Sequence, residues 1–181
     1  MTAVPLVVAL VLAHPQGFHK RVTLELKRTT VDGLIVMDLD GGERCELLRA
    51  GADTNRDGRL DPPEVTALKK KLTTLATLGL KLWISGYPVP LQIQQTKLSL
   101  IEDFRVSQSG VSVAVLLSMR LPYPVTPGMS LGLEDTAPDQ SPVEIEVFQH
   151  GLGDAGALPQ VKRSVGPGER MTVPLGALAS P

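Results

Sequence analysis

The stretch GVSVAVLLSMRL, residues 110–121, decides the fold class of this 181-residue chain. Apolar side chains occupy every second position of the stretch. Because successive side chains of a β-strand point to opposite faces of its sheet, this alternation places one apolar row on one face. The row comprises Val111, Val113, Val115, Leu117, Met119 and Leu121. The stretch is therefore predicted to be a half-buried strand.

Strand-like stretches recur on both sides of it. Further strands are predicted at residues 21–27, 33–40, 80–86, 91–101, 129–135 and 143–149. Clusters of Pro, Gly, Ser and Asp separate them, and SGYPVP at residues 85–90 is typical of a hairpin turn. Many short strands separated by turns predict a mainly β fold, specifically an antiparallel β-sandwich of the Ig-like kind. This sandwich is assigned to residues 14–150. Residues 151–181 are expected to be irregular, with one short strand at MTVPL.

A helical period interrupts the strands within residues 43–78. Apolar residues recur there at helical spacing in two runs, Cys45, Leu48 and Ala52, then Val65, Leu68, Leu72 and Leu75. The start of the second helix is marked by Asp61 at the N-cap, Pro62 at the first helical position and Glu64 three residues after the cap. Cys45, the only cysteine, is expected to be a small buried core residue. These residues predict a helix–loop–helix insertion between strands.

The two predicted helices flank DTNRDGRLDPPE, residues 53–64. This stretch matches the EF-hand calcium loop, with oxygen-bearing side chains at positions 1, 3, 5, 9 and 12 and a glycine at position 6. Gly58 permits the sharp turn of the loop, and the apolar Leu60 is suited to anchor the loop to the core. The residue at position 7 contributes only its backbone carbonyl. The predicted Ca²⁺ ligands are Asp53, Asn55, Asp57, Arg59 through its carbonyl, Asp61 and Glu64.

No second calcium loop is recognisable in the sequence. DTAPDQSPVEIE, residues 135–146, fails because Gln140 stands at the glycine position and prolines interrupt it. A single loop is less preorganised than a paired one, so it is expected to bind Ca²⁺ more weakly. The competing interpretation is a solvated turn, because Asp and Asn also favour turns.

Several stretches together resemble a known architecture: AHPQGF after an apolar leader, the calcium loop, LKLWISGYPVPLQ and KLSLI. Over residues 13–121 the chain resembles the extracytoplasmic N-terminal domain of bacterial nickel/cobalt transporter-like membrane proteins of the hydrogenase/urease-accessory type. The resemblance implies an exported β-rich domain with an EF-hand insertion. Transport itself is not expected, because no segment of this sequence reaches the roughly 20 apolar residues of a membrane-spanning helix.

The N-terminus, MTAVPLVVALVLAHPQGFH, holds an apolar run at residues 4–12, followed by the small residue Ala13. This pattern is typical of the end of a secretory signal, so residues 1–13 are predicted to be a signal peptide and His14 the first mature residue. The competing interpretation is a buried first strand of a cytosolic domain. We expect an extracytoplasmic protein, periplasmic or secreted, and we expect any macromolecular partner to be another exported or membrane protein. The net charge of −1 and the 3% aromatic content argue against binding to nucleic acid.

The sequence thus favours an exported domain that holds one Ca²⁺ for a structural or modulatory purpose. The alternative is a periplasmic protein that binds or delivers Cu, Ni or Co through His14 and His19, with His150 as a further nitrogen ligand. No nucleophile–base pair and no phosphate-binding glycine loop is recognisable. No catalytic residue is therefore predicted, and an enzyme is not expected.

Overall fold

The computed structural model describes residues 18–100, 104–137, 142–149 and 158–175. Within these ranges the chain is mainly β. The strands are β1 (Phe18–Leu26), β2 (Thr30–Leu39), β3 (Leu80–Ile84), β4 (Tyr87–Val89), β5 (Ile93–Leu100), β6 (Val111–Arg120), β7 (Ser130–Asp135), β8 (Val143–Gln149), β9 (Leu158–Val165) and β10 (Arg170–Pro174). Two helices, α1 (Glu43–Ala50) and α2 (Pro62–Thr77), lie between β2 and β3. The predicted signal peptide and His14 lie outside the described residues.

The strands form two sheets. One has six strands in the order β5-β6-β2-β1-β8-β9, and the other has four in the order β10-β7-β3-β4. Neighbouring strands in the described residues are antiparallel, with one exception: β1 runs parallel to β8. The prediction of a mainly β, largely antiparallel fold is confirmed.

Strand β6 lies inside the larger sheet, between the edge strand β5 and β2. Its inward row is buried as the alternation predicts, since Val111, Val113, Val115, Leu117 and Met119 are each at most 1% exposed. The hairpin turn predicted at residues 85–90 is present at Ser85 and Gly86, which both take positive φ, but it joins β3 to the short strand β4. The strand predicted at residues 91–101 is β5, and it belongs to the larger sheet instead.

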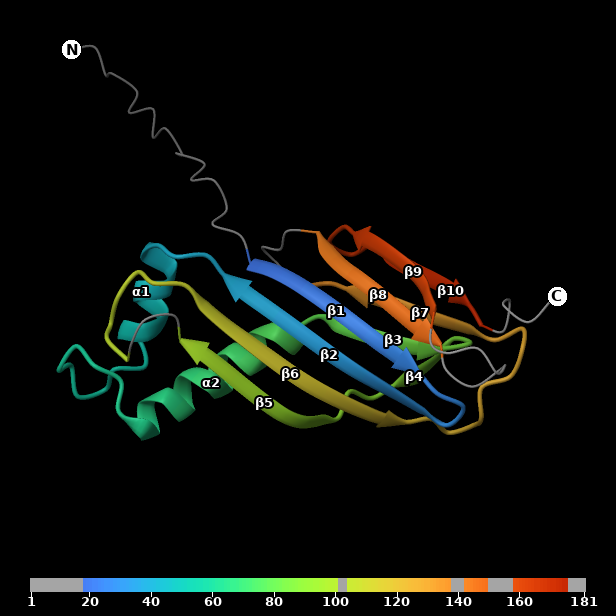
Figure 1. Ribbon diagram of the computed structural model, residues 1–181, viewed down its shortest axis with the longest axis horizontal. Helices are drawn as coiled ribbons and strands as arrows, with labels where there is room; N and C mark the ends of the chain where they lie inside the picture. The colour runs from blue at the N-terminus through green and yellow to red at the C-terminus, as the bar shows by residue number, and fades with distance from the viewer. Residues whose placement is uncertain (1–17, 101–103, 138–141, 150–157, 176–181) are drawn as a thin grey trace, which may run out of the picture.

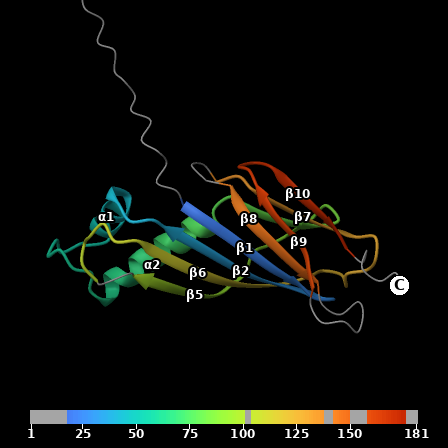
Figure 2. The same ribbon diagram turned by 45° about the horizontal axis from the view of Figure 1, so that its top comes forward.

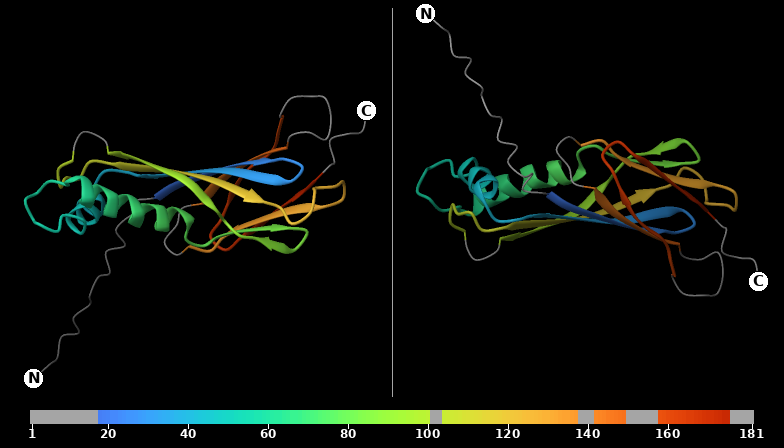
Figure 3. Two further views of the ribbon diagram at one scale, coloured as in Figure 1. Left: turned by 90° about the horizontal axis from the view of Figure 1, so that it is seen from below. Right: turned by 90° about the horizontal axis from the view of Figure 1, so that it is seen from above.

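The molecule has two layers, and the larger sheet is one of them (Figure 1). The smaller sheet lies behind one end of the larger sheet, while α2 lies behind the other end, against β2, β5 and β6 (Figure 3). Leu68, Leu72 and Ala76 of α2 are fully buried in the resulting core. Cys45 of α1 is also fully buried, as predicted, and burial raises the pKa of its thiol.

Helix α2 begins as its sequence predicts. The Asp61 carboxylate accepts a hydrogen bond from the backbone N–H of Glu64 at 3.0 Å, and the Glu64 carboxylate accepts one from the N–H of Asp61 at 3.0 Å. This reciprocal capping box, together with Pro62 at the start of the helix, satisfies backbone donors that the helix leaves unpaired.

The C-terminal segment differs from its prediction. It holds two strands rather than one: β9 pairs with β8, and β10 pairs with β7. The two strands lie at the same end of the molecule (Figure 2). Strand β9 escaped the sequence pattern because it is an edge strand: Lys162, Arg163 and Ser164 are all exposed, so no apolar alternation marks it.

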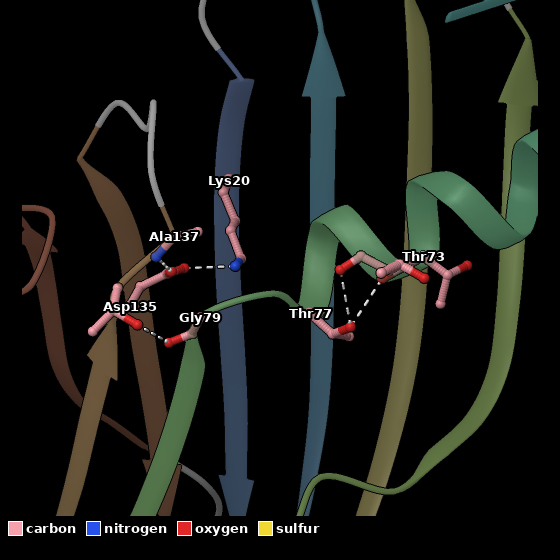
Figure 4. Close-up of polar contacts among 8 residues, drawn as sticks. Lys20, Thr73, Thr77, Gly79, Asp135 and Ala137 are labelled. Carbon is pink, nitrogen blue, oxygen red and sulfur yellow. Dashed lines mark hydrogen bonds and ion pairs between the residues drawn. The ribbon is translucent and has the colours of Figure 1, made fainter. Parts of the chain in front are cut away.

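A buried ion pair joins the two layers (Figure 4). Lys20 Nζ of β1 lies 2.5 Å from Asp135 Oδ2 at the end of β7, and both side chains are 1% exposed. The other oxygen of Asp135 accepts a hydrogen bond from the N–H of Ala137 at 3.0 Å. Removal from water lowers the pKa of Lys20, while the bond to Asp135 acts in the opposite direction.

In the part of the chain that the structure describes, neither helix has the length and apolar character needed to cross a membrane.

Candidate metal centre

The segment predicted to bind calcium connects α1 to α2 and projects from one end of the molecule (Figure 1). Its backbone bends sharply, because Arg56 and Gly58 both take positive φ, 59° and 79°. Glycine reaches this conformation without steric penalty, which is the role predicted for Gly58. Leu60 is 4% exposed and belongs to the hydrophobic core, so it anchors the loop.

Asp53, at the first position of the loop, is 8% exposed. Its Oδ2 accepts a hydrogen bond from the N–H of Gly58 at 3.0 Å, so the carboxylate faces across the loop. Its Oδ1 is buried, and no described residue donates a hydrogen bond to it. A buried carboxylate oxygen without a donor is energetically unfavourable, so Asp53 Oδ1 can still accept a hydrogen bond or contact a cation.

Asn55 and Asp57 shape the exposed half of the loop. The N–H of Asp57 donates to Asn55 Oδ1 at 2.9 Å, and the N–H of Arg59 donates to Asp57 Oδ1 at 2.8 Å. These bonds run from a side chain to a backbone group two residues ahead, which is the usual Asx turn. The two turns fold the backbone of residues 55–59 tightly, which keeps the side-chain oxygens of Asn55 and Asp57 close to the loop backbone.

Glu64, at the last position, is 4% exposed and is held by several donors. Its Oε1 accepts from the N–H and the hydroxyl of Thr54, both at 2.7 Å, and from the N–H of Asn55 at 3.3 Å. Its Oε2 accepts from the N–H of Asp61. The bond from Asp61 and the bonds from Thr54 lower the pKa of Glu64 to about 2.

The predicted ligands therefore do not converge on one point in this structure. Asp53, Asn55 and Asp57 bond within the first half of the loop, whereas Glu64 closes the loop by bonding to both of its ends. Among the described residues, no three His, Cys, Asp or Glu side chains are grouped closely enough to hold a metal ion. The loop residues are neighbours, but each of their carboxylates already accepts a hydrogen bond within the loop.

Sequence reasoning missed the contacts that hold the loop from outside. The segment that precedes β6 bonds to it through the backbone: the N–H of Leu60 donates to the carbonyl of Phe104 at 2.6 Å, and the N–H of Val106 donates to the carbonyl of Gly58 at 2.9 Å. Arg49 of α1 is fully buried and donates to carbonyls of the same segment. The sequence gives no local signal for these contacts, because Arg49 is one of several charged residues in α1.

Of the histidines of the alternative metal site, His19 is the one that lies in the described residues. His19 is exposed, and its Nε2 lies 3.0 Å from Asp40 Oδ2. His14 and His150 lie outside the described residues. The structure thus places one of the three nitrogen ligands, on the surface of β1.

The sequence was compared with models of known protein families and with curated proteins. No model of a known protein family matches the chain, and no curated protein matches it. The function is therefore argued from the loop and its surroundings.

Proposed function

We propose that this protein is an exported, non-catalytic domain that binds one Ca²⁺ at Asp53, Asn55, Asp57, the carbonyl of Arg59, Asp61 and Glu64. In this proposal residues 43–78 are an EF-hand insertion, and the two sheets form an Ig-like sandwich that carries it. The resemblance to extracytoplasmic domains of nickel/cobalt transporter-like proteins supports the exported setting. The ion serves to stabilise the insertion or to modulate its surface.

The observation that carries the proposal is the unpartnered oxygen of Asp53. Asp53 Oδ1 is buried and lacks a donor among the described residues, while Asp53 Oδ2 is held by Gly58. A cation at the centre of the loop would supply the partner that Oδ1 lacks. Hard oxygen donors in a flexible loop favour Ca²⁺ over softer or smaller metals.

The backbone of the loop supports a carbonyl ligand at Arg59. The carbonyl of Gly58 and the N–H of Leu60 form hydrogen bonds with the segment that precedes β6. Arg59, between them, lies opposite Arg105 in an antiparallel bridge. When the two residues beside the bridge form its hydrogen bonds, the N–H and C=O of the central residue point away from the partner segment. The Arg59 N–H does bond to Asp57, on the loop side. The Arg59 carbonyl is therefore directed toward the loop as well.

Calcium binding requires Glu64 to exchange partners. The donors of Thr54 and Asn55 occupy Oε1, so a bidentate Ca²⁺ contact competes with hydrogen bonds that the metal-free loop already has. This competition weakens binding. We therefore expect a dissociation constant of roughly 10⁻⁴ to 10⁻³ M, the range of extracellular modules.

A thermal melt with EDTA, Ca²⁺, Mg²⁺ or Cu²⁺ tests the proposal. Calcium at about 100 times its dissociation constant should stabilise the fold by about 2.7 kcal/mol, which for a domain of this size raises Tm by roughly 5 to 10 °C. Magnesium should do less, because it requires a tighter octahedral shell. Asp53→Asn should abolish the calcium shift without lowering the Tm in EDTA, since it removes a buried charge whose Oδ1 has no partner and keeps an amide oxygen that can accept from the N–H of Gly58.

Asp38→Asn is the matched control, because it removes one carboxylate from β2, outside the loop, and it should keep the full calcium shift. A parent protein whose Tm is unmoved by calcium at about 0.1 M, roughly 100 times the weakest dissociation constant expected, would refute calcium binding. If Cu²⁺ alone raises Tm, the transition-metal function of His14 and His19 replaces it.

A further inference from the structure

The calcium loop has a backbone partner that its sequence does not reveal. Residues 104–106 run antiparallel to the middle of the loop, with Arg105 opposite Arg59. The two backbone bonds of this contact are 2.6 Å, from Leu60 to Phe104, and 2.9 Å, from Val106 to Gly58. The contact is long-range, since more than forty residues separate its two sides along the chain.

This partner segment is itself held by α1. The guanidinium of Arg49 donates to the carbonyls of Arg105 at 3.0 Å, Ser109 at 3.1 Å and Gly110 at 3.2 Å. Arg49 is fully buried, so these bonds form away from water. The carbonyl of Arg49 also accepts a hydrogen bond from the N–H of Asp53 at 3.0 Å. Arg49 thus bonds both to Asp53, at the first position of the loop, and to the segment that pairs with Arg59, at the seventh position.

A second contact locks the same segment to the start of α1. The N–H of Gly42 donates to the carbonyl of Gln108 at 2.7 Å, and the side-chain amide of Gln108 donates to Glu46 at 2.9 Å. The segment 104–110 is therefore bonded to the beginning of α1, to its end and to the loop that follows it. Movement of any one of these parts must strain the bonds to the others.

We infer that residues 104–110, held by Arg49, are the positioning element of the calcium site and preorganise its single loop as a second loop does in a pair. The bridge orients the Arg59 carbonyl toward the ion, and Arg49 keeps the bridge in place. Calcium and the segment then stabilise each other, because coupling between two linked events is reciprocal. This inference rests on the proposed calcium binding, whose ligands are separate from Arg49 and from the segment.

Amide hydrogen exchange followed by NMR on the full chain tests the coupling directly. Calcium should slow exchange at the N–H of Val106 at least tenfold more than at the N–H of Thr136. Thr136 is a suitable reference because its N–H is also bonded to a distant backbone carbonyl, that of Gly79 at 3.0 Å. Equal slowing at both amides would show a general stabilisation of the fold and would overturn the inference.

Arg49→Lys tests the positioning role, with Arg44→Lys as the matched control in the same helix. Lysine keeps the charge but lacks the fork that reaches several carbonyls at once. Arg49→Lys should weaken calcium binding roughly tenfold by titration calorimetry, the equivalent of one hydrogen bond from a charged donor. Arg44 stacks on the ring of Phe18 instead, so Arg44→Lys should leave the calcium affinity unchanged.

The outcomes separate the two proposals. Absence of any calcium heat in the parent protein would overturn the proposed function. Normal calcium binding in the parent, with equal affinities for Arg49→Lys and Arg44→Lys, would overturn the positioning role alone. If Arg49→Lys does not fold, the exchange of Val106 in the parent protein still decides the inference.

Discussion

Replacement of Lys20 by methionine should destabilise this protein more than any surface change. Methionine is close to lysine in length and fits the same inward position of β1, so the change removes charge with little change in packing. It leaves the Asp135 carboxylate 1% exposed, with the N–H of Ala137 as its remaining donor among the described residues. The perturbation therefore isolates an uncompensated buried charge.

The magnitude follows from that geometry. Breaking a buried ion pair from one side costs about 3 to 5 kcal/mol, because the remaining charge has lost its partner and cannot reach water. For a domain of this size that corresponds to a fall in Tm of roughly 6 to 20 °C. Lys27→Met is the control. Lys27 pairs with Asp32 at 2.7 Å but is 46% exposed, so its loss should cost less than about 1 kcal/mol.

The assay is urea and thermal unfolding at neutral pH in EDTA. The double variant Lys20→Met with Asp135→Asn should recover much of the loss, since it removes both charges and leaves an amide oxygen to accept the bond from Ala137. The reasoning is refuted if Lys20→Met lies within about 1 kcal/mol of the parent. It is also refuted if the double variant is no more stable than Lys20→Met.

Three further outcomes are expected. Glu64→Gln should lower stability to urea in EDTA, because a neutral amide loses the charge-assisted bonds around Glu64; a rise in stability would instead indicate that repulsion among loop carboxylates dominates. The folded pKa of Glu64, about 2, lies below its ordinary value of 4.5, so the stability it contributes is complete above about pH 4.5 and lost as the pH falls toward 2. The gap between parent and Glu64→Gln in pH-dependent melts should close across that window, and a constant gap contradicts the assignment. Gly79→Ala should lower the free energy of unfolding in urea far more than Gly58→Ala. Both glycines have positive φ, but a Cβ added at Gly79 would lie 2.2 Å from the backbone N of Ala137, whereas a Cβ added at Gly58 meets open space. Equal losses would exclude the steric contact as the cause.

Local sequence was enough for the features that depend on near neighbours. The alternation of β6, the hairpin turn between β3 and β4 and the capping box of α2 are set by residues a few positions apart, and the structure contains all three. The character of the 53–64 loop as a sharp turn rich in oxygen atoms is equally local. In each case the physical reason is the same, because backbone geometry and short-range hydrogen bonds link the residues directly.

Only the tertiary structure decided the features that join distant parts of the chain. Strand β9 is recognisable by its pairing with β8, and Lys20 occupies a buried position of β1 because Asp135 meets it from the other layer. The bonds from Arg49 and from residues 104–106 to the loop are of the same kind. None of these contacts produces a periodic pattern in the sequence. A polar residue is the same letter whether its hydrogen-bond partner is water or a distant residue. The short-range pattern determined the elements, and long-range hydrogen bonding determined which charges could be buried among them.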